Sequence, residues 1–162
     1  NVDGLKTGHT SGAGFNLIAS AVDGQRRLIA VVMGADSPKG REQQAAKLLH
    51  WGQQNFDTVQ VLQKGQKVGT ERIWYGDKEQ IKLGTDQDFW LALPKAEVSR
   101  IKAKYVLDKK DLEAPIAANQ RVGEISLYDG DKVVGHYPLV TLESINKGGV
   151  FSRMSDYLHH EL

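Results

Sequence analysis

The residue pattern changes near residue 57, and this change constrains the fold more than any other feature of the chain. Before it, residues 15–22 and 27–34 have the pattern of two apolar strands joined by Asp23-Gly24, a two-residue hairpin signal. After it come short segments rich in Val, Ile, Thr and Tyr with turn signals between them, at residues 58–62, 67–75, 89–93, 101–106, 121–128 and 132–142. The change predicts two parts of different fold class, with a boundary at Asp57–Thr58.

Residues 1–57 have the pattern of an α+β fragment. A short strand is expected over residues 1–8, ahead of the two apolar strands. The run over residues 27–34 is almost continuously apolar, so we expect both of its faces to be covered. Ser37-Pro38-Lys39-Gly40 interrupts the pattern, and a helix is expected from about residue 41 to 56, with an apolar stripe of Ala45, Leu48, Leu49, Gly52 and Phe56. Three antiparallel strands and a covering helix are typical of the closing segment of a larger domain.

Residues 58–147 predict an all-β, sandwich-like or barrel-like domain, because short strands and turns recur at regular spacing. Residues 148–162 predict a separate amphipathic helix, whose apolar face would carry Val150, Phe151, Met154, Tyr157 and Leu158. Two interpretations of this helix stay open. It could pack on its own domain, or lie on a membrane surface, although Arg153 is its only Lys or Arg residue.

The composition excludes several classes of function. The chain has 162 residues, 21 of them basic and 20 acidic, and the two signs are balanced in both parts, so no nucleic-acid footprint is expected. It contains no cysteine, which excludes disulfides, thiolate metal ligands and cysteine nucleophiles. The histidines lack acidic partners at ligand spacing, so we expect neither a metal site nor another cofactor.

Lys6-Thr7-Gly8 is the motif that can carry chemistry. A lysine supplies a positive field for a substrate carboxylate and lowers the pKa of neighbouring proton donors. A threonine hydroxyl can donate to the same carboxylate, and a glycine lets a substrate backbone approach the strand edge. For the tripeptide alone, a strand end with a solvated lysine is the simpler interpretation.

The sequence around the tripeptide is more specific. Residues 1–10 and 13–21 resemble the low-molecular-mass penicillin-binding proteins of the peptidase S11 type, which act as D-alanyl-D-alanine carboxypeptidases. Lys39-Gly40-Arg41-Glu42 and Ile73-Trp74-Tyr75-Gly76-Asp77 are also similar to this family, and the resemblance covers essentially the whole chain. It implies that residues 1–57 belong to a β-lactamase/transpeptidase-like domain. It also implies substrate-binding roles for Lys6, Thr7, Gly8, His9 and Arg41.

The resemblance exposes a missing part of the catalytic machinery. The family needs a Ser-x-x-Lys motif and a Ser-x-Asn motif well ahead of Lys-Thr-Gly, which here begins at residue 6. Ser99-x-x-Lys102 and Ser144-x-x-Lys147 spell the first motif, but both lie in the β-rich part, where no catalytic helix is expected. We therefore assign no catalytic residue, and we expect a C-terminal fragment that is inactive alone.

The resemblance also implies what the longer enzyme does. It would remove the terminal D-alanine from peptidoglycan stem peptides, be acylated by β-lactams, and lie in the periplasm, peripheral to the inner membrane through residues 150–162. The alternative is a non-catalytic stalk or interaction module that positions a catalytic domain at the membrane or mediates self-association. Because the apolar strands lack their expected neighbours, we expect the fragment to form a homo-oligomer or a strand-swapped dimer.

Overall fold

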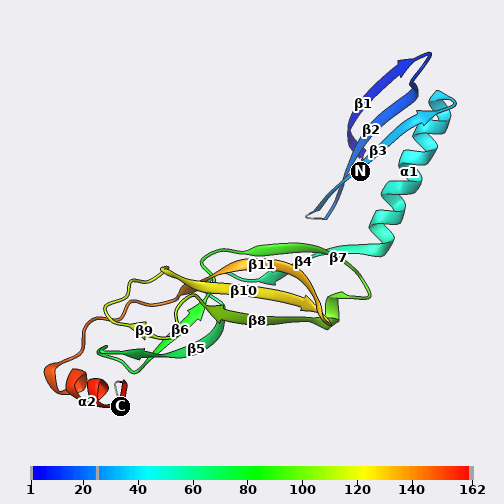
Figure 1. Cartoon of the computed structure of the whole chain (residues 1–162). Helices are drawn as coiled ribbons and strands as arrows, with labels where there is room; N and C mark the ends of the chain where they lie inside the picture. The colour runs from blue at the N-terminus through cyan, green and yellow to red at the C-terminus, as the bar shows by residue number, and fades with distance from the viewer. Residues whose placement is uncertain (1, 25, 161–162) are drawn as a thin grey trace. The chain divides into compact units, whose positions relative to one another are not determined.

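The structure is a computed structural model that describes residues 2–24 and 26–160 (Figure 1). It separates into two compact units, Asn1–Val59 with Ala92–Val98, and Gln60–Leu91 with Ser99–Leu162. The first unit contains β1 (Val2–Thr10), β2 (Gly14–Asp23), β3 (Arg26–Ala35) and α1 (Pro38–Asn55). The remaining elements are β4 (Phe56–Leu62), β5 (Lys67–Trp74), β6 (Gln80–Gly84), β7 (Phe89–Pro94), a 3-10 turn (Val98–Arg100), β8 (Ile101–Leu107), β9 (Leu112–Glu113), β10 (Arg121–Asp129), β11 (Lys132–Thr141) and α2 (Val150–His160).

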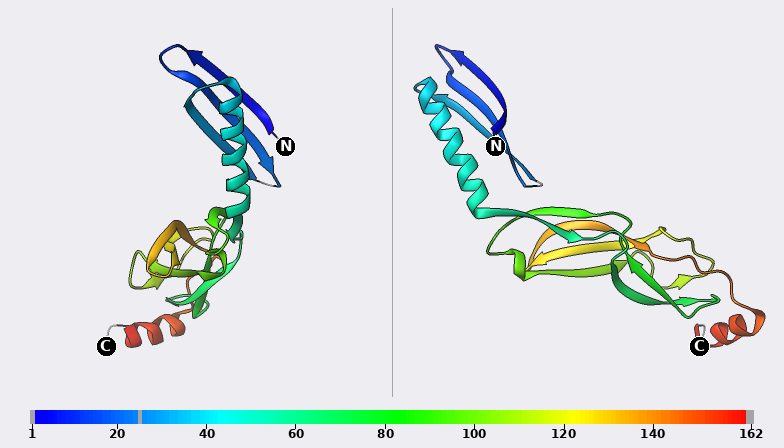
Figure 2. Two further views of the ribbon diagram at one scale, coloured as in Figure 1. Left: turned by 90° about the vertical axis from the view of Figure 1, so that its right-hand side faces the viewer. Right: turned by 180° about the vertical axis from the view of Figure 1, so that it is seen from behind.

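The first unit is an antiparallel sheet in the order β1-β2-β3, with α1 along one of its faces (Figures 1 and 2). Alternate residues of β2 and β3 are buried against Ala45 and Leu49 of α1, namely Leu17, Ala19, Ala21, Ala30 and Val32. The opposite face is exposed and still apolar, with Ile18, Ile29, Val31 and Met33 between 47% and 78% exposed. The prediction that both faces of residues 27–34 are covered is therefore wrong for this chain, because one helix can cover only one face.

The β2–β3 hairpin is confirmed, but its turn lies one residue further along than predicted. Asp23 pairs with Arg26, so Asp23 is the last residue of β2 and not the first residue of the turn. Gly24 has a φ of +63°, the left-handed conformation that glycine adopts without strain. Arg26 then ties the hairpin to the helix, because its guanidinium binds the Asp23 carboxylate and donates to the carbonyl of Gln53 at 3.2 Å.

The predicted helix is confirmed, but it begins three residues earlier than expected. Ser37 is its N-cap, and the Ser37 hydroxyl accepts a hydrogen bond from the Gly40 amide at 3.0 Å. Pro38 occupies the first helical position, where its missing amide hydrogen costs nothing. Ser37-Pro38-Lys39-Gly40, which interrupts the strand pattern, is thus the capping sequence of α1. Within the expected stripe, Ala45 and Leu49 are buried, whereas Leu48 is 47% exposed.

The second unit is β-rich, as predicted. Its six-stranded sheet has the order β8-β10-β11-β6-β5-β9. Apart from this sheet, β4 pairs with β7, and each of these two strands has residues in both units. The core is formed by fully buried aliphatic side chains, including Ile73, Ile81, Leu83, Ile125, Leu127 and Leu139. The short strands β6 and β9 were not expected from the sequence. Both lie next to turn residues, and in β9 only two residues pair with β5.

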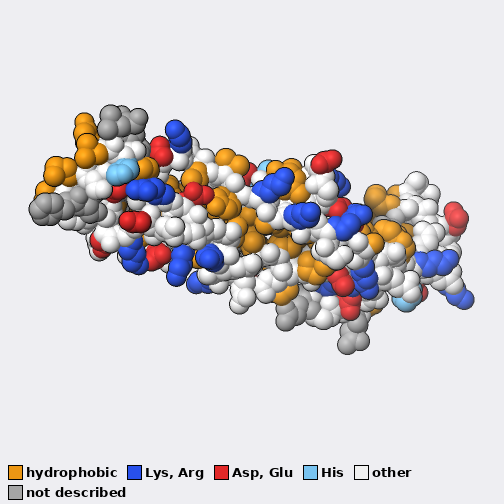
Figure 3. All heavy atoms as spheres, turned by 90° about the horizontal axis from the view of Figure 1, so that it is seen from below, with side chains coloured by type: hydrophobic (Ala, Val, Ile, Leu, Met, Phe, Trp, Pro, Cys, Tyr) orange, Lys and Arg blue, Asp and Glu red, His pale blue; other side chains and the backbone are white. Residues whose placement is uncertain are grey.

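The last helix, α2, is held to the β-rich unit by its polar side. The Asp156 carboxylate accepts from the Arg72 guanidinium at 3.0 Å and from the Tyr75 amide at 2.8 Å. Val150, Met154, Tyr157 and Leu158 are between 55% and 75% exposed; the side chain of Phe151, expected on the same face, lies outside the described part of the chain. Figure 3 shows hydrophobic side chains gathered around α2, at the left of the view. Neither α1 nor α2, as far as they are described, is long and apolar enough to cross a membrane.

Candidate functional site

The Lys6-Thr7-Gly8 motif lies in the middle of β1, the end strand of the first sheet. Within residues 2–24 and 26–160, β1 pairs with β2 only, so its outer edge has no strand beside it. The register places Lys6 opposite Ile18, Thr7 opposite Leu17 and Gly8 opposite Asn16. An edge strand of this kind offers unpaired backbone amides and carbonyls to an extended ligand.

Strand alternation separates the motif residues between the two faces of the sheet. Residues opposite each other in an antiparallel pair share a face, so Thr7 lies on the same side as Leu17, which is buried against α1. Lys6 lies on the other side with the exposed Ile18, and its ammonium donates to the Thr7 carbonyl at 2.8 Å. Lys6 is exposed and is therefore accessible to an anionic ligand.

His9 and Arg41, from different elements, both contact the aromatic ring of Phe15. The His9 ring stacks on Phe15 with a centroid distance of 3.9 Å, and the Arg41 guanidinium carbon lies 5.7 Å from the Phe15 centroid. Arg41 also donates to the Asn16 carbonyl at 3.4 Å. No acceptor among the described residues reaches the buried Nε of Arg41. The structure thus joins two predicted residues that lie 32 positions apart in the sequence.

Two residues of β2 that were not predicted as site residues hold this arrangement together. Phe15 links His9 to Arg41, and the Asn16 side chain accepts from the Gly34 amide of β3 at 2.9 Å. Gly14 precedes them with a φ of +66°, and a Cβ there would lie 3.1 Å from the Ala35 carbonyl oxygen. Once the β1–β2 turn is fixed at residues 11–13, the register places Phe15 opposite His9, so the hairpin signal contained this information.

Gly8 lies on β1 beside open space. A Cβ built on Gly8 would meet no atom within 4 Å, so the protein's own packing does not require glycine at this position. The space beside Gly8 is therefore open to whatever approaches the strand edge.

An ion pair and a hydrogen bond on the face that carries Lys6 hold the start of β1 against the other two strands. The Asp3 carboxylate of β1 binds the Arg27 guanidinium of β3 at 2.6 Å, and the Ser20 hydroxyl of β2 donates to Asp3 at 3.3 Å. The hydrogen bonds from Arg27 hold the pKa of Asp3 below its ordinary value. One exposed cluster thus links all three strands on the face that carries Lys6.

The two Ser-x-x-Lys strings do not form a nucleophile–base pair on a helix. Ser99 lies in the 3-10 turn and Lys102 in β8, while Ser144 and Lys147 lie outside the helices. Residues three apart face each other only on a helix, so neither string has the backbone that the motif needs.

Two family models match the chain. The model described as penicillin-binding protein 5, C-terminal domain, matches residues 56–147, which is more than half of the chain. The chain belongs to this family. The model described as D-alanyl-D-alanine carboxypeptidase, of the peptidase S11 type, matches residues 1–37, which include β1 and its motif. The resemblance to S11-type penicillin-binding proteins is thereby confirmed.

Curated and solved members of this group of proteins resemble the chain over nearly its full length. It is 76% identical over 161 residues to D-alanyl-D-alanine carboxypeptidase DacD of Salmonella typhimurium, covering 99% of this chain and 41% of the relative. Penicillin-binding protein 6B from Escherichia coli matches with a TM-score of 0.61 and 63% identity, over 87% of this chain and 35% of that chain. Penicillin-binding protein 5 from Haemophilus influenzae matches with a TM-score of 0.77 and 42% identity, over 91% and 43%. The chain spans about two fifths of the length of these relatives.

The stack of His9, Phe15 and Arg41 leads to a first prediction. Replacing Phe15 by leucine removes the aromatic ring that His9 and Arg41 both contact. The imidazole proton signals of His9 should then lose their ring-current shift. Two-dimensional NMR of the imidazole CH groups measures this directly. Phe89→Leu, which removes a ring stacked on Tyr137 in the β-rich unit, is the matched control and should leave His9 unchanged. Equal His9 spectra in the wild-type chain and Phe15→Leu would contradict the stack.

Proposed function

We propose that this chain is the C-terminal part of a serine D-alanyl-D-alanine carboxypeptidase that removes the terminal D-alanine of peptidoglycan pentapeptides and is acylated by β-lactams. The observation that carries the proposal is the Lys6-Thr7-Gly8 motif on a strand edge with no neighbour among the described residues. The similarity to D-alanyl-D-alanine carboxypeptidases over 99% of the chain supports it. Such an enzyme would work in the periplasm.

Each motif residue has a role in this proposal. The Lys6 ammonium would provide the positive field that holds the carboxylate of the departing D-alanine, with the Thr7 hydroxyl donating to it. The substrate backbone would lie along the outer edge of β1, where the absence of a side chain at Gly8 allows close approach. His9 and Arg41 would line the neighbouring part of the pocket, held in place by Phe15.

The nucleophile of this reaction is not assigned to any residue of the chain. The reaction would use a serine of a Ser-x-x-Lys helix to attack the scissile carbonyl, and backbone amides would stabilise the oxyanion. The substrate-binding strand would then be supplied by residues 2–10 and the covalent chemistry by another segment.

Labelling with a fluorescent penicillin tests this division of roles. We expect no covalent band on a denaturing gel for these 162 residues, and a strong band for a longer chain that adds the Ser-x-x-Lys segment. In the longer chain, Lys6→Gln should slow labelling by about a hundredfold or more, because a cation facing the ligand carboxylate is lost in a site shielded from water. Lys39→Gln, on the exposed first turn of α1, is the control and should label normally. A band on the 162-residue chain would refute the proposal.

The way α2 is held favours a second, non-catalytic role for the β-rich unit, as a spacer that presents this helix to the inner-membrane surface. Asp156 binds the β-rich unit through Arg72 and the Tyr75 amide, and this leaves the apolar side chains of α2 exposed. An exposed apolar helix face is the feature by which peripheral proteins enter the lipid headgroup region. The carboxypeptidase would then be peripheral to the membrane.

Vesicle co-sedimentation tests the second role. Anionic phospholipid vesicles should pellet the wild-type chain, and Met154→Ser/Leu158→Ser should reduce the bound fraction several-fold, because two apolar side chains are lost from the contact face. Val106→Ser is the matched control, since Val106 is 72% exposed on β8 in the same unit. Equal binding of all three chains would reject the membrane contact.

The exposed face of the first sheet supports self-association of this chain, as a homo-oligomer or strand-swapped dimer. Ile18, Ile29, Val31 and Met33 form an apolar surface on the side opposite α1, and β3 is also an end strand in the described sheet. Either feature would be covered by a second copy.

A further inference from the structure

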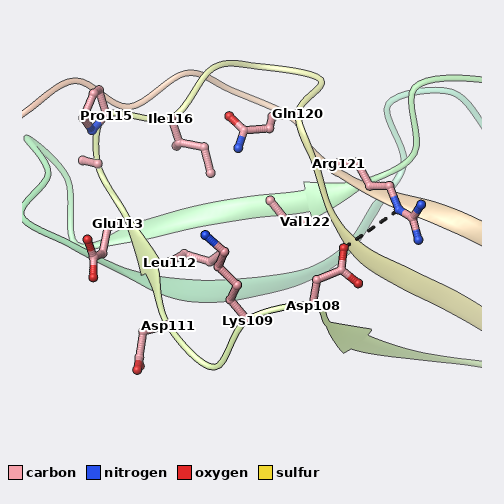
Figure 4. A pocket seen from close by; sticks show the side chains of 11 residues that line it. Asp108, Lys109, Asp111, Leu112, Glu113, Pro115, Ile116, Gln120, Arg121 and Val122 are labelled. Carbon is pink, nitrogen blue, oxygen red and sulfur yellow. Dashed lines mark ion pairs between the residues drawn. The ribbon is translucent and has the colours of Figure 1, made fainter.

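A cavity of 460 Å³ lies in the β-rich unit, next to β9, an end strand of its six-stranded sheet (Figure 4). The end strands of this sheet are β8 and β9, and only residues 108–111 connect them. The cavity is lined by this connection, by β9 and the following loop, and by the start of β10. Its volume is in the range of sites that bind small ligands and short peptides.

The floor of the cavity is apolar and rigid. Leu112, Ile116 and Val122 line it, and each is at most 7% exposed because its side chain belongs to the core of the unit. A ligand resting on this floor would bury apolar groups against an already packed surface, so the protein would lose little conformational freedom on binding.

Two cations, Lys109 and Arg121, and three carboxylates, Asp108, Asp111 and Glu113, line the cavity, and it is the cation of Lys109 that extends over the apolar floor. In Figure 4 the Lys109 ammonium and the Gln120 amide extend over the floor, whereas Asp111 points away from it. Among the described residues, no carboxylate forms an ion pair with Lys109. At the rim, Arg121 faces Asp108 at 4.0 Å, and both side chains are more than half exposed, so this pair is weak in water and can open toward a ligand.

One wall of the cavity offers an unpaired strand edge. The Ala114 amide donates to the Trp74 carbonyl of β5 at 2.9 Å, so Ala114 faces β5. The backbone groups of neighbouring strand residues point to opposite sides, and those of Glu113 therefore point away from β5, where the sheet has no further strand in the described residues. An extended peptide can pair with such an edge through its own backbone.

We propose that this cavity binds the C-terminal end of a short extended peptide with small apolar side chains. Its terminal carboxylate lies between the Lys109 ammonium and the Gln120 amide, its side chains rest on Leu112, Ile116 and Val122, and its backbone pairs with Glu113. This peptide site is separate from the Lys6 strand and belongs to the other unit. The choice of a D-alanine terminus for the probe, but not the site itself, rests on the proposed function.

The test uses the ¹⁵N-labelled 162-residue chain and the probe Nα,Nε-diacetyl-Lys-D-Ala-D-Ala, followed by NMR. We expect amide shifts at residues 109, 113 and 120–122 that saturate with a dissociation constant in the millimolar range or below. The same peptide with a C-terminal amide should bind about tenfold more weakly, because the charge-assisted hydrogen bond to Lys109 is lost.

Matched variants locate the interaction. Lys109→Gln should weaken binding about tenfold, whereas Lys110→Gln changes the neighbouring lysine, which does not line the cavity, and should bind normally. The shifts at residues 109, 113 and 120–122 are measured separately from those at residues 2–10, so failure of the carboxypeptidase proposal leaves this result intact. Equal affinity of the acid and the amide, equal loss in Lys109→Gln and Lys110→Gln, or shifts confined to residues 2–10 would each overturn the proposal.

Discussion

The pairing of β1 with β2 determines where every candidate residue of the first unit lies. With Lys6 opposite Ile18 and His9 opposite Phe15, strand alternation sends Lys6 to the exposed face and His9 to the face that α1 covers. A shift of one residue would exchange the two sets and separate His9 from Arg41. The Asp3–Arg27 ion pair and the hydrogen bond from Ser20 to Asp3 oppose such a shift, because they join β1 to β3 and to β2 at a fixed offset.

The parts that the sequence predicted well are those governed by local rules. The hairpin around residue 24, the helix up to Asn55 and six of the later strands follow from period, turn residues and β-propensity. The errors arose where one signal has two meanings. Ser37-Pro38 can end a pattern or cap a helix, and the apolar run in β3 predicts burial on both faces even when only α1 is present to cover it. The strand β9 has two residues and is too short to show an alternation of apolar and polar residues in the sequence.

The sequence predicted which residues belong to the candidate site, but it did not predict how they are arranged in space. A motif names Lys6, Thr7 and Gly8, but only the fold shows that Gly8 lies beside open space and that Phe15 joins His9 to Arg41. The cavity at the open edge of the second sheet is beyond sequence reasoning, because it exists only where residues 112–116 and 120–122 approach each other in space. Both proposed ligand sites therefore use the same physical device, a strand edge with no protein neighbour in the described chain and a lysine beside it.

The open edge of β1 is the central claim, and amide hydrogen exchange of this strand in the 162-residue chain tests it most directly. If only β2 pairs with β1, every second amide over residues 4–9 should be protected, and the amides between them should exchange at nearly the rate of an unstructured peptide. Uniform protection of all these amides would contradict the account, because it would mean that another strand already occupies the edge assigned to the substrate.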